Sequence, residues 1–486
     1  MKTGILCSLL GLIIIFRSMV YGQSTFEYIS AKVDTDQLVA DAVCSVNGEM
    51  IFVGTNQTGS VSEGHIFTLS KNGEQIRERF FSWQGKNTSL GNILPVGPNR
   101  FLVIGSVAKQ EIHNLLVCLI DTTLNEVCSK EFSLGSYNYL YAKSFKDHDN
   151  NVIIHGTVSD TVTFYDIYPY LFKISPNLDS IRLKILDGNA WGIFDMVEKS
   201  NLTGYYLFLN PNYTVKYQGP AVLSIDAEFN VVKTQHLPRA VENYHTVKWI
   251  SDSTYIFSGE YVDLNGNAKT TLGAVVADTF MAEKFFNHFG EDTVTNFPGL
   301  RRNLDFITPN QIYIGGTTNF GYTTVFMNHD SWFFLNKIDS TLTISWQKIY
   351  GKPGFYYTLW GVLAIDDGGC VMYGTRYHYP SDSFTRDIYI LKVDKHGYTV
   401  SINDDRPTQD ILVKLYPNPG SDEVFIQSDL TNAVFELMDN LGREVCRTNL
   451  MSKKTRIATE NIASGLYLYK IIHNKIVVCS GKWIKY

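Results

Sequence analysis

The sequence has few charged residues and no cluster of basic ones. Aspartate, glutamate, lysine and arginine make up 19% of the 486 residues, and the formal net charge is -6. No run of lysine and arginine is present that could displace counterions from nucleic-acid phosphates. These absences argue against a nucleic-acid-binding protein. The hydrophobic content of 44% argues equally against a disordered chain.

Long hydrophobic runs are also missing, except at the N-terminus. There, Lys2, the apolar stretch Ile5 to Phe16 and the residues Val20 to Gly22 follow the pattern of a signal peptide. An anchor helix is the alternative, but the stretch is shorter than the roughly 18 apolar residues that a membrane span needs, and Arg17 interrupts it. We therefore predict that residues 1–22 are removed and that the mature chain has no integral membrane segment.

Motifs of common catalytic and metal centres are absent as well. The chain has no H-E-x-x-H, no Cys/His pattern with zinc spacing, no G-x-S-x-G elbow and no P-loop. The sequence therefore predicts no metal, no cofactor and no catalytic residue that can be named. Enzymatic activity stays open at this point, and a non-enzymatic role is favoured.

Cysteine is scarce, with seven residues, one of which lies in the predicted signal peptide. Cys118 and Cys128 flank the turn Asp121 to Glu126, so a hairpin would bring them near each other. An exported protein can keep disulfides, which makes this pair a candidate. Buried free thiols are the favoured alternative, because connectivity does not follow from sequence.

What the chain does contain is a sevenfold repeat. An apolar strand ending in Asp or Ser recurs roughly every 50 to 60 residues, the period of a repeat architecture. The side-chain oxygen of this Asp or Ser is expected to cap the backbone of a tight turn. The seven copies are Ile66–Ser70, Val117–Asp121, Leu171–Ser175, Val222–Asp226, Ala274–Asp278, Phe334–Asp339 and Ile390–Asp394.

A second marker, a glycine inside an apolar strand, precedes the first in six of the seven units. Glycine within a strand permits a bulge or a close backbone approach, as expected for strands crowded around an axis. The glycines are Gly54, Gly105, Gly156, Gly259, Gly316 and Gly374, whereas the fourth unit has Asn210-Pro211.

Each unit holds four short strands, and four-stranded sheets repeated radially form a β-propeller. We therefore predict an all-β fold in which residues 23–403 form a seven-bladed β-propeller. The segment Phe26 to Val33 is a spare strand that we expect to pair into the last blade and close the ring. An array of β-sandwiches is the structural alternative.

The composition changes after the propeller. Residues 404–412 are predicted to be an exposed linker, and residues 413–486 show short alternating segments separated by turns. That pattern predicts a small immunoglobulin-like β-sandwich.

This last domain carries four motifs in order: Tyr416-Pro417-Asn418-Pro419, Asp439 with Gly442-Arg443, Gly465 with Tyr467, and a terminal glycine followed by Lys482. The series resembles the C-terminal sorting domain of type IX (Por) secretion substrates of Bacteroidota. The resemblance implies recognition by the outer-membrane secretion machinery, removal of the domain, and a secreted or outer-surface location reached through the periplasm.

Aromatic residues before and after the glycine strands are the candidates for ligand contact. They are Tyr137, Tyr139, Tyr356, Tyr357, Trp360 and Tyr377. Rings on loops at a propeller face could stack on sugars or anchor a peptide, although packing between blades is the simpler role for any single ring. The expected function is a binding or adhesion module for a glycan or a protein. The alternatives are a glycan-active hydrolase or lyase with carboxylates meeting in the propeller funnel, and a structural surface component.

Overall fold

The chain forms two all-β domains in a computed structural model. The structure describes residues 24–109, 112–162, 166–186, 193–209, 221–236, 241–262, 270–291, 293–321, 326–381, 384–399, 414–428, 430, 433–439, 443–473 and 476–486. Among these residues the only helix is the single 3-10 turn η1 (Trp83–Gly85). The predicted signal peptide and linker lie outside the described residues.

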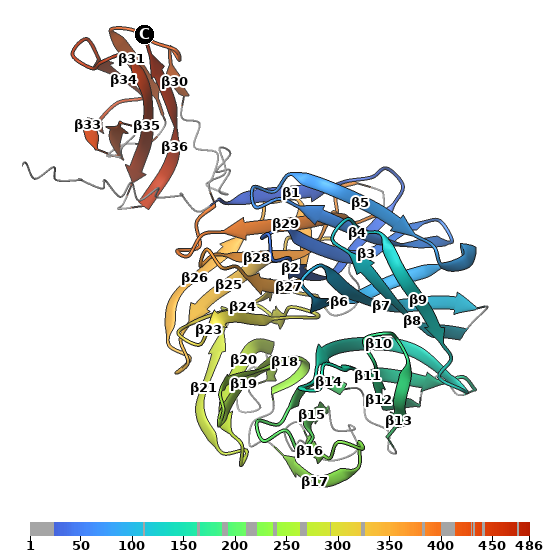
Figure 1. The fold of residues 1–486 in the computed structure, drawn as a ribbon. Coiled ribbons are helices and arrows are strands. Elements are labelled where there is room, and N and C mark those ends of the chain that lie inside the picture. Colours follow the sequence, from blue (N-terminus) through green and yellow to red (C-terminus); the bar gives the residue numbers. More distant parts are fainter. Residues whose placement is uncertain are drawn as a thin grey trace, which may run out of the picture.

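The first domain consists of seven antiparallel sheets arranged around a centre (Figure 1). Blade 1 contains β2 (Asp36–Cys44), β3 (Met50–Thr58), β4 (Val61–Leu69) and β5 (Gln75–Phe81). Blade 2 contains β6 (Thr88–Gly97), β7 (Arg100–Lys109), β8 (Ile112–Asp121) and β9 (Glu126–Phe132). Blade 3 contains β10 (Tyr137–Lys146), β11 (Val152–Asp160), β12 (Ile167–Ile174) and β13 (Ser180–Ile185). Blade 4 contains β14 (Ile193–Glu198), β15 (Tyr205–Leu209), β16 (Ala221–Ile225) and β17 (Val231–His236).

The remaining blades follow the same order from the inner to the outer strand, with one variation. Blade 5 contains β18 (Val241–Ser251), β19 (Thr254–Val262), β20 (Thr270–Asp278) and β21 (Glu283–Phe289). In blade 6 the inner strand is split into β22 (Asn296–Pro298) and β23 (Leu304–Thr308), which both pair with β24 (Gln311–Thr318), followed by β25 (Trp332–Ile338) and β26 (Ile344–Tyr350). Blade 7 contains β27 (Phe355–Ala364), β28 (Cys370–His378), β29 (Asp387–Val393) and, as its outer strand, β1 (Phe26–Ser30).

The ring is closed by the N-terminal strand, as the sequence predicts. β1 pairs antiparallel with β29, with Phe26 opposite Lys392 and Ser30 opposite Ile388. β2 of blade 1 contacts both β6 of blade 2 and β27 of blade 7, so the first and last blades are neighbours. The β-propeller is therefore confirmed, and the array of sandwiches is wrong.

All seven predicted turns are capped by their Asp or Ser side chain. In blade 2, for example, Oδ1 of Asp121 accepts the backbone N–H groups of Thr123 at 2.8 Å and Asn125 at 2.9 Å. The hydroxyl of Ser70 accepts from Asn72 and Glu74 in the same way. The other caps are Ser175, Asp226, Asp278, Asp339 and Asp394.

These turns also tie neighbouring blades together. Arg79 on the outer strand of blade 1 donates to the carbonyl of Leu124 in the turn of blade 2, at 2.7 Å. Lys130 donates in the same way to Leu178 of blade 3. At the junction of blades 7 and 1 the hydroxyl of Ser24 donates to the carbonyl of Lys71 at 2.7 Å. This junction therefore also has a side-chain hydrogen bond to a turn carbonyl of the next blade.

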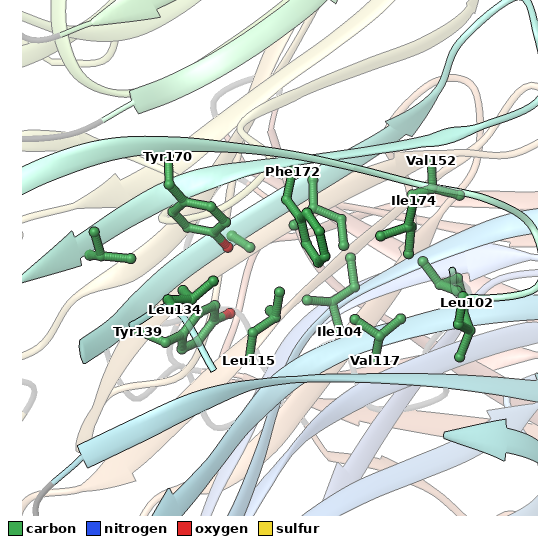
Figure 2. Close-up of a cluster of buried hydrophobic side chains, with 14 of the residues drawn as sticks. Leu102, Ile104, Leu115, Val117, Leu134, Tyr139, Val152, Tyr170, Phe172 and Ile174 are labelled. Carbon is green, nitrogen blue, oxygen red and sulfur yellow. The ribbon is translucent and has the colours of Figure 1, made fainter. Parts of the chain in front are cut away.

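The apolar faces of successive blades pack on one another. Seven buried clusters within the described residues each combine side chains of two adjacent blades, including blades 7 and 1. Figure 2 shows the cluster between blades 2 and 3, where Ile104, Leu115 and Val117 of blade 2 face Tyr170 and Phe172 of blade 3. Because a blade cannot bury both of its faces alone, the ring is the unit that is stable.

The repeated glycines allow a close backbone contact inside the blades. A Cβ on Gly54 would lie 1.8 Å from the carbonyl oxygen of Leu38, and one on Gly105 would lie 2.0 Å from that of Ser89. On both inner strands a register shift follows directly after the approaching carbonyl. Glycine is thus required because the bulged inner strand presses against the second strand.

The second domain is a two-sheet sandwich. One sheet contains β30 (Lys414–Tyr416), β31 (Glu423–Gln427) and β34 (Lys454–Ala458). The other contains β33 (Glu444–Leu450), β32 (Ala433–Met438), β35 (Gly465–His473) and β36 (Ile476–Lys485). Its core includes Val424, Phe435, Leu437 and Trp483, all buried.

Candidate functional site

A cavity of about 960 Å³ lies at the centre of the propeller. All seven inner strands contribute to its wall, and so do the turns that follow β14 and β18. The volume falls within the range of roughly 300–1,000 Å³ that is typical of ligand sites. The cavity is therefore the place in the propeller where side chains of every blade can meet one ligand.

The inner strands present polar side chains to this cavity because they are bulged. Register shifts occur between Val39 and Asp41 in β2, and between Leu90 and Asn92 in β6. A third lies between Ile193 and Asp195 in β14. The polar residue after each shift lines the cavity wall. A bulge re-aims the side chains that follow it, which explains polar residues inside apolar strands.

Asp41 joins four blades. Its Oδ2 accepts from the amide of Asn92 at 2.7 Å and from the backbone N–H of Ile93 at 3.1 Å, both in blade 2. Its Oδ1 accepts from the hydroxyl of Tyr373 in blade 7 at 3.1 Å and lies 3.0 Å from Nη2 of Arg302 in blade 6. This buried carboxylate is thus fully engaged in holding the ring.

Asp195 has a similar role on the other side of the cavity. Its Oδ2 accepts the backbone N–H of Val247 in blade 5 at 2.9 Å and lies 3.4 Å from Nζ of Lys143 in blade 3. Burial lowers the pKa of Lys143, and the charge of Asp195 opposes that shift. Burial also lowers the pKa of His155, 3.6 Å from Asp195, to about 4, so this imidazole is neutral at pH 7.

A third carboxylate of the wall makes the same kind of contact between blades. Oδ2 of Asp305 in blade 6 accepts the backbone N–H of Ala364 in blade 7 at 2.9 Å. Its Oδ1 lies 2.5 Å from Nζ of Lys248 in blade 5. Asp41, Asp195 and Asp305 therefore share one arrangement, in which a carboxylate on one blade binds the next blade's backbone and a cation.

The rim of the cavity is more exposed. Nδ1 of His148 lies 2.5 Å from Oε1 of Glu198, and this hydrogen bond raises the pKa of His148. The indole N–H of Trp249 donates to the carbonyl of Glu198 at 2.8 Å, which fixes the half-buried ring at the wall. Asp252 is an exposed carboxylate of the rim.

Four of the six predicted ligand-facing rings are packed inside the propeller. Tyr139, Tyr356, Tyr357 and Tyr377 are buried, and the hydroxyl of Tyr357 accepts the backbone N–H of Lys352. An aromatic ring on a period-2 strand fills the space between blades, and burial excludes these four from direct ligand contact in this structure.

The other two rings are half-buried. Tyr137 packs edge-on against Tyr168, 5.5 Å between ring centroids, beside the cluster of blades 2 and 3. The ring of Trp360 lies 5.8 Å from the guanidinium carbon of Arg301, which lines the cavity. A ligand-facing role for Tyr137 and Trp360 stays a prediction.

The candidate disulfide between Cys118 and Cys128 is not formed. Cys118 and Cys128 are both free thiols, the first buried and the second exposed. In the β8–β9 pair Cys118 lies opposite Ser129, whereas Cys128 lies opposite Leu119. Because neighbouring positions of a strand point to opposite faces, the two sulfur atoms face away from each other.

The motifs of the terminal domain meet around its last strand. Oδ1 of Asn418 accepts the backbone N–H of Ile484 at 3.0 Å, and its amide donates to the carbonyl of Lys482 at 2.7 Å. The indole of Trp483 donates to the carbonyl of Pro417 at 3.1 Å. The first and last motifs, far apart in sequence, are thus one structural unit that clamps β36.

Three of the remaining motif residues, Asp439, Arg443 and Tyr467, also serve the fold of this domain. Asp439 accepts from the backbone N–H and the guanidinium of Arg443 across the β32–β33 turn, whereas Gly442 lies outside the described residues. Gly465 begins β35, and the hydroxyl of Tyr467 donates to the carbonyl of Ala463 at 2.6 Å. Pro419, Lys482 and half-buried Tyr416 lie at its surface.

The polar wall of the cavity was not predicted from the sequence. Asp41, Asn92, Lys143 and Asp195 follow the repeat period, each as a polar residue within an inner strand. The recurrence of a polar residue at the repeat period is the sequence pattern that could have identified these four residues. Arg301 and Arg302 had no such signal, because they lie in the segment that interrupts the inner strand of blade 6. No group of three or more His, Cys, Asp or Glu side chains in the described part of the chain could hold a metal ion.

A comparison with known protein families matches the terminal domain by sequence. Residues 414–485 match the family described as the secretion system C-terminal sorting domain. No curated protein matches the chain. No helix within the described residues is both long and apolar enough to span a bilayer.

The solved structures found by comparison have very low sequence identity and TM-scores below 0.5. An alpha-L-arabinanase of Penicillium chrysogenum, complexed with arabinobiose, is 8% identical with a TM-score of 0.41, covering 77% of this chain and 98% of that one. A mutant apocarotenoid oxygenase of Synechocystis is 11% identical with a TM-score of 0.40, covering 78% and 96%. A eukaryotic initiation factor is 10% identical with a TM-score of 0.31, covering 65% and 88%. None of the three is similar enough to carry an argument about function.

Proposed function

The chain carries a type IX C-terminal sorting domain, and from this premise we propose that it is an exported binding protein whose propeller holds a glycan or protein ligand in its central cavity. The sorting domain indicates export and a secreted or cell-surface location. The binding role is the proposal. Cleavage of residues 1–22 and removal of the sorting domain after export belong to it.

The observation that carries this proposal is the set of hydrogen bonds that join neighbouring blades within the cavity wall. Three carboxylates, those of buried Asp41 and Asp305 and of half-buried Asp195, bind the backbone of a neighbouring blade and hold the inner strands together. A site that is already ordered loses little conformational entropy when a ligand binds. The geometry therefore favours recognition of a ligand that fits the cavity as it stands.

The competing function is a glycan-active hydrolase or lyase. Glycoside hydrolysis needs two carboxyl groups, one of which donates and regains a proton. Protonation of Asp41, Asp195 or Asp305 would break a contact between blades, which makes these three poor general acids. Glu198 and Asp252 at the rim are the remaining carboxylates of the wall, and Glu198 is bonded to His148.

A glycan and peptide array, run beside an activity screen on the mature chain, tests the proposal. We expect one class of ligand to bind without being cleaved. Turnover that is lost in Glu198→Gln or Asp252→Asn would contradict the binding-only function and support the enzyme. Both residues lie at the rim, so both variants are expected to keep the wild-type melting temperature, which serves as the control.

A further inference from the structure

The outer face of the terminal domain carries a group of exposed apolar side chains. Leu466, Leu468 and Ile484 are 48%, 40% and 45% exposed on the paired strands β35 and β36 (Figure 1). Leu466 lies opposite Ile484, and Leu468 lies opposite Lys482, so the four side chains are neighbours on one face of the sheet. We call these four residues the β35–β36 patch. Exposed apolar residues are common singly, whereas a contiguous group of them is a candidate interaction site.

The core of the domain does not use the β35–β36 patch. Tyr467 and Trp483 alternate with the patch residues along the same two strands, and both are buried between the two sheets. The outer face of a sandwich normally meets water, so polar side chains are expected at the patch positions. The apolar residues there add nothing to the core and need another explanation.

Lys482 is an unpaired charge on this face. Its side chain is exposed and makes no hydrogen bond or ion pair with other described residues. Two neighbouring cations are paired instead, because Glu436 lies 2.8 Å from Nη1 of Arg447 and 2.7 Å from Nζ of Lys470. The β35–β36 patch therefore combines three apolar side chains with one positive charge that is available to a partner.

The sorting motifs on these two strands separate into internal and external residues. The indole of Trp483 donates to the carbonyl of Pro417, and the hydroxyl of Tyr467 donates to that of Ala463, so both side chains are used inside the domain. Lys482, which belongs to the last motif, is left on the surface. A motif side chain that does nothing for the fold is free to bind a partner.

We infer that the β35–β36 patch is the surface by which the sorting domain binds a protein of the type IX secretion machinery. The family match at residues 414–485 implies an interaction with that machinery, and the patch lies within the matched residues. The partner surface is expected to carry apolar side chains beside a carboxylate that pairs with Lys482. The inference rests on the sorting domain and not on the propeller, so its failure leaves the proposed binding function untouched.

A protein partner suits the patch better than a lipid bilayer or a second copy of the chain does. Stable membrane binding takes a broad apolar face with several basic residues, whereas this patch has three apolar residues and one unpaired lysine. A symmetric pair of chains uses the same surface twice, which would bring both copies of Lys482 into one interface without a counter-charge.

Export of the full-length chain by a bacterium with a type IX secretion system tests the inference. We expect the wild type on the cell surface or in the medium. The triple variant Leu466→Ser, Leu468→Ser, Ile484→Ser should reach these fractions at least tenfold less and collect in the periplasm, because a few central side chains carry most of the binding energy of an interface. Lys482→Glu should lower export more than Lys482→Gln, since it repels the carboxylate of the partner.

Met451→Ser and Lys233→Glu are the matched controls. Met451, 72% exposed, follows β33 of the same domain, and Lys233 lies on the exposed outer strand β17 of the propeller. Both variants should be exported as the wild type is. Melting temperatures of the full-length variants, purified from a host without the secretion system, show that each is folded. If the triple variant melts early, Lys482→Glu decides, because that change removes no apolar contact.

Wild-type export of the triple variant, or an equal loss in Met451→Ser, would overturn the inference. Analytical ultracentrifugation and cosedimentation with vesicles of phosphatidylethanolamine and phosphatidylglycerol test the other occupants. A dimer or vesicle binding that is lost in the triple variant while export is unchanged would assign the patch to a second copy or a membrane. A wild-type chain that stays in the periplasm would overturn the inference together with the proposed export, whereas the ligand array tests the propeller separately.

Discussion

Single glycines decide whether the inner strands can bulge. Gly54 is the clearest case, because the nearest atom to an added Cβ would be a backbone oxygen that cannot turn away. Gly54→Ala forces the two strands of blade 1 apart beside the polar wall of the cavity. We expect this single methyl group to destabilise the propeller by about 1–3 kcal/mol or more, since 1–3 kcal/mol is the usual cost of overpacking a core.

Chemical unfolding of the variant and of Gly97→Ala, a matched control, measures this effect. A Cβ on Gly97 would lie 3.9 Å from Arg100, its nearest neighbour, so that variant should unfold as the wild type does. If Gly54→Ala were as stable as Gly97→Ala, the close-approach explanation of the repeated glycines would be wrong.

A residue pattern could be predicted from the sequence when it arises from contacts between residues that are close along the chain. The caps at Asp121 and Ser70 follow from the sequence, because a side chain that binds the backbone two and four residues later needs no tertiary context. Burial of Tyr357 does not follow, since the alternation of a strand cannot tell the space between blades from a propeller face. The register of the β8–β9 pair, which places Cys118 and Cys128 on opposite faces of the sheet, could not be predicted from the sequence either.

At the scale of elements, the capped turns make the propeller sensitive to acid. A hydrogen bond from the hydroxyl of Thr123 and backbone N–H groups lower the pKa of Asp121. A hydrogen bond from Lys284 and two backbone N–H groups lower the pKa of Asp278. A carboxylate with a depressed folded pKa stabilises the fold above its unfolded pKa, about 3.8, and loses this contribution as the pH falls through the folded value.

We therefore expect the turn of blade 2 to open progressively as the pH falls below 3.8, before the turn of blade 1. Hydrogen–deuterium exchange at pH 7 and pH 3, corrected for intrinsic rates, measures this. The amides of Thr123 and Asn125 should lose protection at low pH. Those of Asn72 and Glu74, bound to the hydroxyl of Ser70, should keep it and serve as the internal control. Equal loss in both turns would mean that titration of the caps is not the cause.

At the scale of the whole molecule, the number and order of the blades could be predicted, whereas the contacts across the centre could not. The repeat identifies each blade separately, and closure could be predicted because a spare strand precedes the first unit and can pair into the last blade. The approach of Arg301 in blade 6 to Gly91 in blade 2 depends on the finished ring. So does the meeting of Asp41 with Arg302 and Tyr373. No local pattern encodes the diameter of the ring, which sets these distances.

Closure by β1 is the step on which the rest of the propeller depends. β1 pairs with β29 in blade 7, yet its side chains also reach blade 1. The hydroxyl of Tyr28 donates to Gln75 at 2.6 Å, and Lys32, just beyond the strand, lies 3.1 Å from Glu78. The ring of buried Phe26 packs against Gly73. One strand thus supplies both a sheet partner and a contact between blades at the junction of blades 7 and 1, which joins distant parts of the chain.

A mature chain without residues 26–33 should therefore melt well below the full one. Loss of the burial of Phe26 alone removes about 1.5–3 kcal/mol, and 1 kcal/mol shifts the midpoint of a sizeable domain by about 2–4 °C. We expect a fall of at least about 5 °C by scanning calorimetry, with Phe26→Ala in between because it keeps the strand pairing. A wild-type melting temperature after the deletion would show that the blades hold the ring closed without β1. The cavity would then owe its shape to packing between blades rather than to the joining of the two ends.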